Sequence, residues 1–166
     1  MPTKPLVLCA ILLCSGPRLA IAQSVTDPAV FADLAASSNM FEIESSTLAL
    51  DKATGDDVKA FAQHMIDDHT AAGEKMKAAA EKDGVVPPAA MADKEQALIE
   101  KLQSADGEAF DEAYLTAQTA AHDQAVALFE SFSENGRESA LASFAAETLP
   151  TLEEHQNAVH ELADGD

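Results

Sequence analysis

Strong helix-ending signals are few and widely spaced between Asp27 and the end of the chain, and this spacing constrains the fold more than any other feature. They fall at Gly55, at Gly84 followed by Pro87-Pro88, at Asp106-Gly107 and at Asn135-Gly136. Each of the four longest intervals has room for many helical turns. Hydrophobic residues make up 47% of the chain, and Ala, the strongest helix former, is prominent among them. The sequence therefore predicts an all-α protein.

The intervals also predict how the helices are connected. Asp27-Pro28 is a strong helix start, with Asp as N-cap and Pro at the first helical position. We expect four long helices, over about 28–54, 56–83, 108–134 and 137–163, and a shorter one over 91–103. Tight corners join the first pair and the last pair, whereas a long connection carrying the short helix joins the second and third long helices. This is the connectivity of a ferritin-like four-helix bundle.

Apolar spacing indicates which faces turn inward. On the third long helix the expected inward residues are Phe110, Tyr114, Ala117, Ala121, Leu128 and Phe132. On the first helix the apolar residues that recur at helical spacing are Val30, Leu34, Phe41 and Leu48. Pro150 falls inside the fourth long helix and should kink it, because proline removes one backbone hydrogen bond.

Residues 1–22 have the three parts of a secretory signal peptide. Lys4 precedes an unbroken apolar run over residues 6–14, and Ala20-Ile21-Ala22 places small residues before a cut ahead of Gln23. We predict export to the periplasm or beyond, leaving a single bundle domain over 23–166 with its core over about 27–163. Cys9 and Cys14 both lie in the removed segment, so the mature protein would have no thiol ligand and no disulfide.

The chain is strongly acidic. It has 10 basic and 29 acidic residues, a formal net charge of −19, and loss of Lys4 and Arg18 would make it more negative. Such a chain repels nucleic acid and anionic lipid, so neither is expected as a partner. No segment after residue 22 is apolar enough to predict a membrane span. The charge attracts cations only weakly, and its simpler interpretation is a solvated surface that resists aggregation.

All five histidines fall on the long helices, and three of them turn toward the core on a helical wheel. His155 lies on the inward face with Leu152, His69 at the core edge, and His122 at the boundary, whereas the other two histidines lie farther out. On the first helix, Glu42 is the candidate inward carboxylate. We interpret Glu42, His69, His122 and His155 as candidate metal ligands, with supporting roles for Asp68, Gln118, Glu154 and Tyr114.

Two interpretations of these residues remain open. Neutral imidazole and carboxylate are ligand types for a divalent transition metal such as zinc, iron, copper or manganese. Alternatively, buried Glu and His can hydrogen-bond one another and fix helix register with no metal. A carboxylate-bridged di-iron centre is not expected, because its Glu-x-x-His pairs are missing: Ile66 and Leu152 stand three residues before His69 and His155.

The chain resembles an exported bacterial family, domain of unknown function 4142, which often carries the label of an outer membrane protein. The resemblance covers about residues 27–163. It is carried by Ser38-Asn39-Met40-Phe41-Glu42-Ile43-Glu44, Leu48-Ala49, Val58-Lys59-Ala60-Phe61-Ala62-Gln63, Met65-Ile66-Asp67-Asp68-His69, Phe110-Asp111-Glu112-Ala113-Tyr114, Ala121-His122, Thr148-Leu149-Pro150-Thr151-Leu152 and His155. It implies a ferritin-like four-helix fold and an exported location, and the family's Glu and three His match Glu42, His69, His122 and His155.

Three functions fit these observations. The first is an exported bundle that binds or handles a transition metal. The second is a non-catalytic periplasmic stress or envelope-interaction protein whose buried Glu and His are structural. The third, a metal-dependent oxidoreductase, ranks last because Glu-x-x-His is absent and no substrate pocket can be recognised. No catalytic residue is assigned, and an enzymatic role is not favoured.

Overall fold

The computed structural model describes residues 25–165, so the predicted signal peptide over 1–22 lies outside the described residues. Within 25–165 the only regular secondary structure is α-helix, which confirms the all-α prediction. The helices are α1 (Pro28–Lys52), α2 (Asp56–Asp83), α3 (Asp93–Gln103), α4 (Glu108–Asn135) and α5 (Ala140–Asp164). The last helix begins later than expected, because the Ser139 hydroxyl accepts a hydrogen bond from the backbone N–H of Ala142 and caps it.

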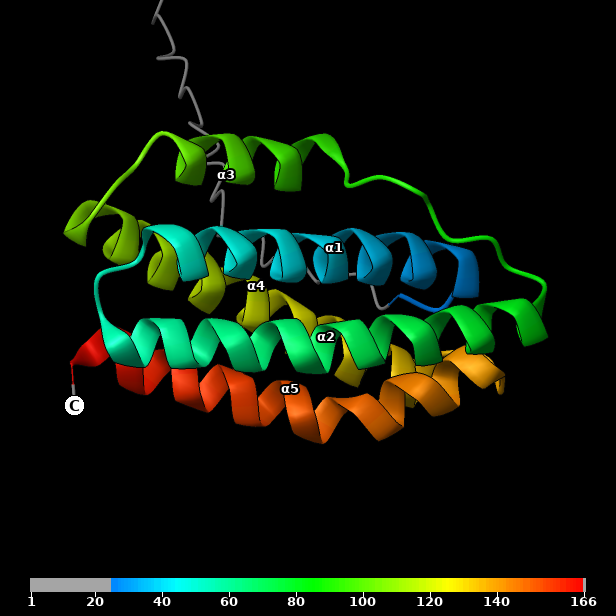
Figure 1. Cartoon of the computed structure of the whole chain (residues 1–166). Helices are drawn as coiled ribbons and strands as arrows, with labels where there is room; N and C mark the ends of the chain where they lie inside the picture. Colours follow the sequence, from blue (N-terminus) through cyan, green and yellow to red (C-terminus); the bar gives the residue numbers. More distant parts are fainter. Residues whose placement is uncertain (1–24, 166) are drawn as a thin grey trace, which may run out of the picture.

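The four long helices form a closed bundle, and the short helix lies outside it. Around the bundle α1 contacts α2, α2 contacts α5, α5 contacts α4, and α4 returns to α1. Figure 1 shows α3 running along the outside of α1, at the end of the long connection from α2. The predicted four-helix bundle with a short helix in its longest connection is therefore confirmed. No helix in residues 25–165 is both long and apolar enough to cross a membrane.

Local capping chemistry sets several helix ends. The Asp27 side chain accepts a 2.8 Å hydrogen bond from the backbone N–H of Ala29, and Pro28 occupies the first turn of α1. Gly84 ends α2 in the left-handed conformation, with φ of 70°. Pro150 lies inside α5 as predicted, and α5 is visibly bent in Figure 1.

Asp83 closes α2 and also caps a different helix. Its carboxylate accepts hydrogen bonds from the backbone N–H groups of Ala140 and Leu141 at 2.9 and 2.8 Å, at the start of α5. Partial burial raises the pKa of Asp83, but these hydrogen bonds outweigh that effect and hold the pKa below its usual value. Stability from this contact is therefore present above the unfolded-state pKa, near 3.9, and is lost as the pH falls through the folded-state pKa.

We predict that Asp83→Asn lowers the free energy of unfolding by about 0.5–1.5 kcal/mol at pH 7, the usual net value of one hydrogen bond, because the amide keeps only one of the two acceptor oxygens. At pH 3 the difference from the wild type should shrink, because the wild-type carboxylate is then increasingly protonated. Urea unfolding at the two pH values measures both effects. Asp33→Asn, at an exposed position of α1, is the matched control and should change neither. An equal loss at both pH values would contradict the charged-cap account.

The apolar core consists of two clusters, one toward each end of the bundle. The first is built around Phe31, Phe129, Phe132, Leu141 and Phe144, and the second around Phe41, Phe61, Met65, Phe110 and Tyr114. Along α2, α4 and α5 a buried histidine stands between the residues of the two clusters: His69, His122 and His155 respectively. The sequence thus places a polar layer in the middle of the bundle.

The inward face of α4 is the expected one only in part, because Phe110, Tyr114 and Phe132 are fully buried as predicted but the other three residues are not. Ala117, Ala121 and Leu128 are only half-buried, whereas Gln118 and His122 are buried. The helix is rotated so that these polar side chains face inward, where Ser45 accepts a hydrogen bond from Gln118. Val30 and Leu34 on α1 are likewise exposed, at 47% and 49%. Apolar spacing alone predicted some inward positions wrongly, because it takes no account of polar side chains that are buried with hydrogen-bond partners.

Candidate metal centre

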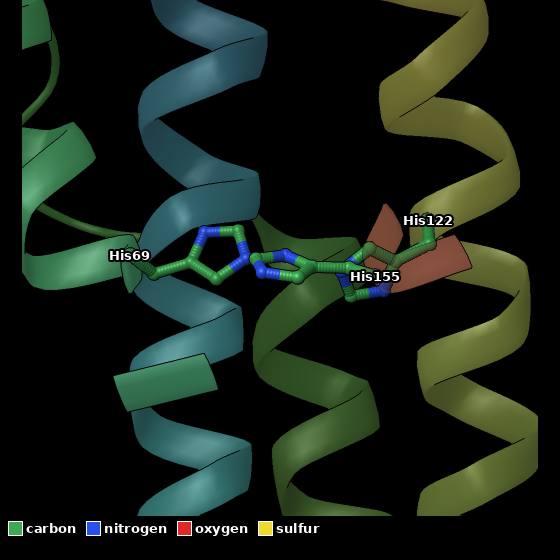
Figure 2. Close-up of side chains that lie close together, drawn as sticks. All are labelled: His69, His122 and His155. Atoms are coloured by element: carbon green, nitrogen blue, oxygen red, sulfur yellow. The ribbon is translucent and has the colours of Figure 1, made fainter. Parts of the chain in front are cut away.

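Three imidazoles from three helices meet in the polar layer. His69 of α2, His122 of α4 and His155 of α5 each offer one ring nitrogen, and these atoms all lie within 4.8 Å of one another. Their ring centroids are 5.5 to 5.8 Å apart. Figure 2 shows the three rings lying close together between the helices. All three residues are at most 6% exposed, so this is an interior site.

Two of the three rings have their proton position fixed by an oxygen acceptor. His122 Nδ1 lies 3.0 Å from the backbone carbonyl oxygen of Gln118, which can only accept, so Nδ1 carries the proton and Nε2 holds the lone pair. His155 Nε2 lies 2.9 Å from a carboxylate oxygen of Asp68, which leaves the lone pair on Nδ1. Such oxygen partners orient histidine ligands in metal sites.

The third ring is held by a residue of α1. His69 Nδ1 lies 3.1 Å from Asn39 Oδ1, an arrangement in which Nδ1 donates and Nε2 keeps its lone pair. Gly73, one turn further along α2, allows this approach, because a Cβ there would lie 2.9 Å from Asn39 Nδ2. All three imidazoles are thus anchored through one nitrogen and keep the other free.

The free nitrogens are buried without a hydrogen-bond partner among the described residues. They are His69 Nε2, His122 Nε2 and His155 Nδ1. Leaving a buried polar atom unpaired typically costs about 1–3 kcal/mol. Three such atoms on neighbouring rings are difficult to explain as a structural network, in which each nitrogen would face a donor or an acceptor. A metal ion, by contrast, takes lone pairs of this kind.

Glu42 is buried close to this cluster but is not a member of it. It is 1% exposed, and its Oε2 also lacks a hydrogen-bond partner. The group of ligand atoms within 4.8 Å comprises the three imidazoles alone. Burial raises the pKa of Glu42, whereas the nearby His122 and a hydrogen bond from Gln118 act in the opposite direction.

The four supporting residues have different places in the structure. Asp68 holds His155, and Gln118 holds His122 through its backbone carbonyl while its side chain donates to Ser45 at 3.0 Å. Tyr114 is buried on α4, about two turns before His122, and its hydroxyl lies 2.9 Å from Ser46 Oγ. Glu154 is exposed on α5.

Sequence reasoning did not identify Asn39 or His64. Asn39 lies 30 residues before the imidazole that it contacts, on a different helix, so no local pattern could connect the two. His64 was placed on the outer side of α2, and it is exposed there, but it shares the Asp68 carboxylate with His155. The only sequence signal for His64 was its spacing of four residues from Asp68, which places both side chains on one face of the helix.

Burial favours the neutral form of His69 and His155. Burial lowers the pKa of His69 well below its usual value, and the neighbouring His122 and His155 lower it further. Burial also lowers the pKa of His155, although Asp68 opposes this effect. Below pH 6.5 the unfolded chain therefore takes up protons that the folded chain does not, so stability falls with falling pH. At neutral pH His69 and His155 keep their lone pairs.

Fold and site together define an all-α four-helix bundle with a buried cluster of three imidazoles at its centre. A family model for Domain of unknown function (DUF4142) matches residues 16–162. The chain belongs to this family, as its resemblance indicated.

Comparison with solved structures found a similar bundle. The structure "CopM in the Cu(II)-bound form" aligns with a TM-score of 0.70 at 16% sequence identity, over 84% of this chain and 98% of that one. At this identity the likeness establishes the shared fold. Comparison with curated proteins found no match.

Proposed function

We propose that this protein binds one transition-metal ion through His69 Nε2, His122 Nε2 and His155 Nδ1. The observation that carries the proposal is the convergence of three anchored imidazoles whose second nitrogens are buried without a partner. Nitrogens bound to one tetrahedral ion at ~2.1 Å lie roughly 3.4 Å apart, so the rings need only a small closing movement to reach this geometry.

The donor set selects the class of metal. Calcium and magnesium prefer oxygen ligands, whereas imidazole suits zinc, copper, iron and nickel. Among divalent ions bound by nitrogen, Cu(II) generally binds most tightly. The similar structure of CopM is in its Cu(II)-bound form, which makes copper the first ion to test here. Zinc, iron and manganese are the competing ions.

In this proposal the negative charge of ionised Glu42 balances part of the positive charge of the metal ion. A buried carboxyl group whose pKa is raised can ionise when a cation binds nearby, because the cation favours the charged form. The ionised group would offset part of the charge that the metal brings into the core. Turning toward the ion would make Glu42 a fourth ligand.

Binding rather than catalysis is the role that the surroundings of the site favour. The cavity that His69 lines has a volume of about 30 Å³, enough for a water molecule but not for a substrate. A metal-dependent oxidoreductase would need room beside the metal for its substrate. The purely structural network is disfavoured by the three unpaired nitrogens.

Export is part of the proposal, because residues 1–22 read as a signal peptide and the protein would meet its metal outside the cytoplasm. We expect N-terminal sequencing of the protein from its native cell to begin at Gln23 or within a few residues of it. A cytoplasmic protein that retains Met1 would contradict export, although it would leave the metal site unaffected.

The direct test is calorimetric titration of chelator-treated protein with Cu(II), Zn(II) and Mg(II). We expect one Cu(II) or Zn(II) per chain and no binding of Mg(II). Nitrogen hyperfine structure in the Cu(II) electron paramagnetic resonance spectrum should indicate imidazole ligands. Affinity should weaken toward acid pH, because protons compete for the same lone pairs. Absence of binding by Cu(II), Zn(II), Mn(II) and Fe(II) would refute the proposed function.

A further inference from the structure

A second cluster of potential ligands lies beside the buried centre and reaches the surface. His64, Asp68 and His155 each offer one ligand atom, and these atoms also lie within 4.8 Å of one another. One carboxylate oxygen of Asp68 lies 3.0 Å from His64 Nε2 and 2.9 Å from His155 Nε2. Exposure of the side chains falls from 63% at His64 to 38% at Asp68 and 4% at His155. The cluster therefore connects solvent with the interior.

His155 belongs to both clusters. Its ring centroid lies 5.3 Å from that of His64 on the outer side, and 5.5 and 5.6 Å from those of His69 and His122 on the inner side. Its Nε2 contacts Asp68, and its Nδ1 is the buried nitrogen without a partner. A single imidazole thus has one nitrogen in each cluster.

This sharing prevents both clusters from holding a metal through a neutral His155. A neutral imidazole has one N–H and one lone pair, so Nε2 can bind a metal only while Nδ1 carries the proton. For the inner centre to bind, the proton must be on Nε2, where Asp68 accepts its hydrogen bond. The outer cluster can therefore hold an ion only before the inner centre is filled.

We propose that His64, Asp68 and Nε2 of His155 form a capture site that takes a transition-metal ion from solvent and passes it to the buried three-histidine centre. This proposal rests on the proposed function. During transfer the bonds from the ion to His64, Asp68 and His155 Nε2 break, and bonds form to His69 Nε2, His122 Nε2 and His155 Nδ1. The His155 ring gives up its Nδ1 proton and takes up one at Nε2, where Asp68 accepts the hydrogen bond. Both metal and ring keep their charge, so no oxidant or reductant is needed.

The surface around Asp68 suits this role. Asp68 lines a cavity of about 110 Å³ between α2 and α5, together with Glu147 and Thr148. Two carboxylates, Asp68 and Glu147, outnumber the single ammonium group of Lys75 at this depression, on a chain whose net charge is −19. Negative charge at such a place raises the local concentration of cations and speeds their association.

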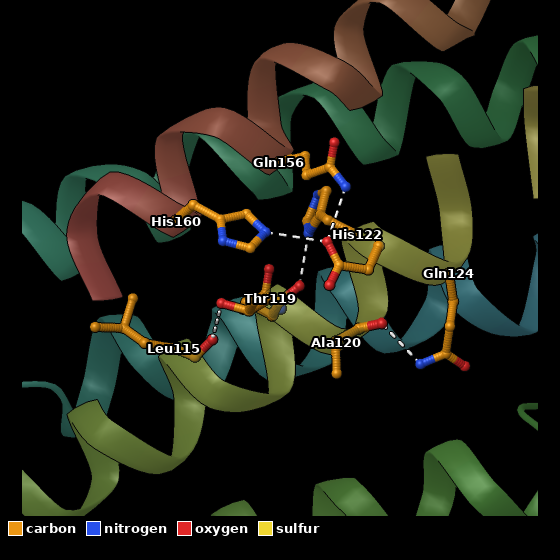
Figure 3. A network of polar contacts seen from close by, with 9 residues as sticks. Leu115, Thr119, Ala120, His122, Gln124, Gln156 and His160 are labelled. Atoms are coloured by element: carbon orange, nitrogen blue, oxygen red, sulfur yellow. Dashed lines mark hydrogen bonds and ion pairs between the residues drawn. The ribbon is translucent and has the colours of Figure 1, made fainter. Parts of the chain in front are cut away.

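The chain contains a matched pair that lacks the buried neighbours. His160 Nε2 lies 3.0 Å from Asp123 Oδ1, with side-chain exposures of 48% and 50%. The Asp123 carboxylate also accepts a 2.8 Å hydrogen bond from Gln156, which lies near His160 on α5 (Figure 3). This pair has the same chemistry as His64 and Asp68, but His160 is not in either cluster of potential metal ligands. His160→Ala is therefore the control for His64→Ala.

The experiment measures the rate of metal loading by stopped flow. Tyr114 is the only tyrosine and the chain has no tryptophan. Its ring lies 6.4 Å from that of Phe61, which lies 6.4 Å from that of His122, so paramagnetic Cu(II) in the inner centre should quench its fluorescence. We expect His64→Ala to slow Cu(II) loading by about tenfold, the lower end of the loss that follows removal of one supporting group from a metal site. Wild type and His160→Ala should load at the same rate.

Equilibrium titration of the same proteins separates the two proposals. One Cu(II) per chain with similar affinity in the wild type and in His64→Ala, together with slow loading of the variant, supports the capture site. Loading of His64→Ala at the wild-type rate would overturn the capture site and leave the inner centre intact. Two tightly held ions in the wild type, one of them lost in His64→Ala, would also overturn it, because the outer cluster would then be a permanent site. Absence of Cu(II) binding by the wild type would overturn the proposed function itself.

Discussion

Replacing His122 by Ala is expected to abolish the stabilisation that bound metal gives. An ion that binds only the folded chain, at a free concentration of 100 times its Kd, adds about 2.7 kcal/mol to the free energy of unfolding. For a chain of this size that corresponds to a rise in Tm of roughly 5–10 °C. His122→Ala removes one of three nitrogen ligands, so at the same Cu(II) concentration its Tm should not rise.

His122 is chosen because it belongs to the inner centre alone and has no part in the outer cluster. Calorimetry with and without Cu(II) gives the metal-dependent rise for each protein, which removes the effect of the substitution on the metal-free fold. His160→Ala should keep the full wild-type rise. A rise of wild-type size in His122→Ala would exclude the inner centre as the binding site. A purely structural network predicts no rise in any of the proteins.

Replacing Phe31 by Ala is expected to destabilise the protein by about 3–5 kcal/mol, the usual cost of removing a buried aromatic ring. Phe31 is fully buried and stacks on Phe132 of α4, with ring centroids 4.1 Å apart and planes 7° from parallel. It also meets Phe129 edge-on, with centroids 5.0 Å apart. The ring therefore joins α1 to α4 at one end of the bundle.

The neighbouring residue is the control for this prediction. Val30 is 47% exposed, so Val30→Ala should change the free energy of unfolding by no more than about 0.5 kcal/mol. Urea unfolding of the two variants tests which face of α1 is buried. A rotation of the helix by one residue would exchange the effects of the two substitutions. Equal losses for Phe31→Ala and Val30→Ala would contradict the orientation of this helix.

Local signals determined the helices and their order. Asp27-Pro28 begins α1 through a hydrogen bond to a residue two positions away, and Gly84 ends α2 by adopting a positive φ. Such effects act within one turn of helix, so the sequence contains all that is needed to predict them. The long connection after Gly84 then limits the topology, because the other two junctions between long helices, α1 to α2 and α4 to α5, are tight. Proximity of the histidines to the core followed from helical periodicity.

Only the tertiary structure decided which atoms meet. The Asn39 contact to His69 spans 30 residues, and the contact of Asp68 to His155 spans 87. Apolar spacing on α4 correctly predicted the burial of Phe110, Tyr114 and Phe132. It missed Gln118, whose buried side chain donates a hydrogen bond to Ser45 of another helix. Glu42 was correctly expected to turn inward, yet its distance from the three imidazoles depends on how α1 sits against α4. These properties arise from contacts between helices far apart in the chain, and no periodicity within one helix can encode them.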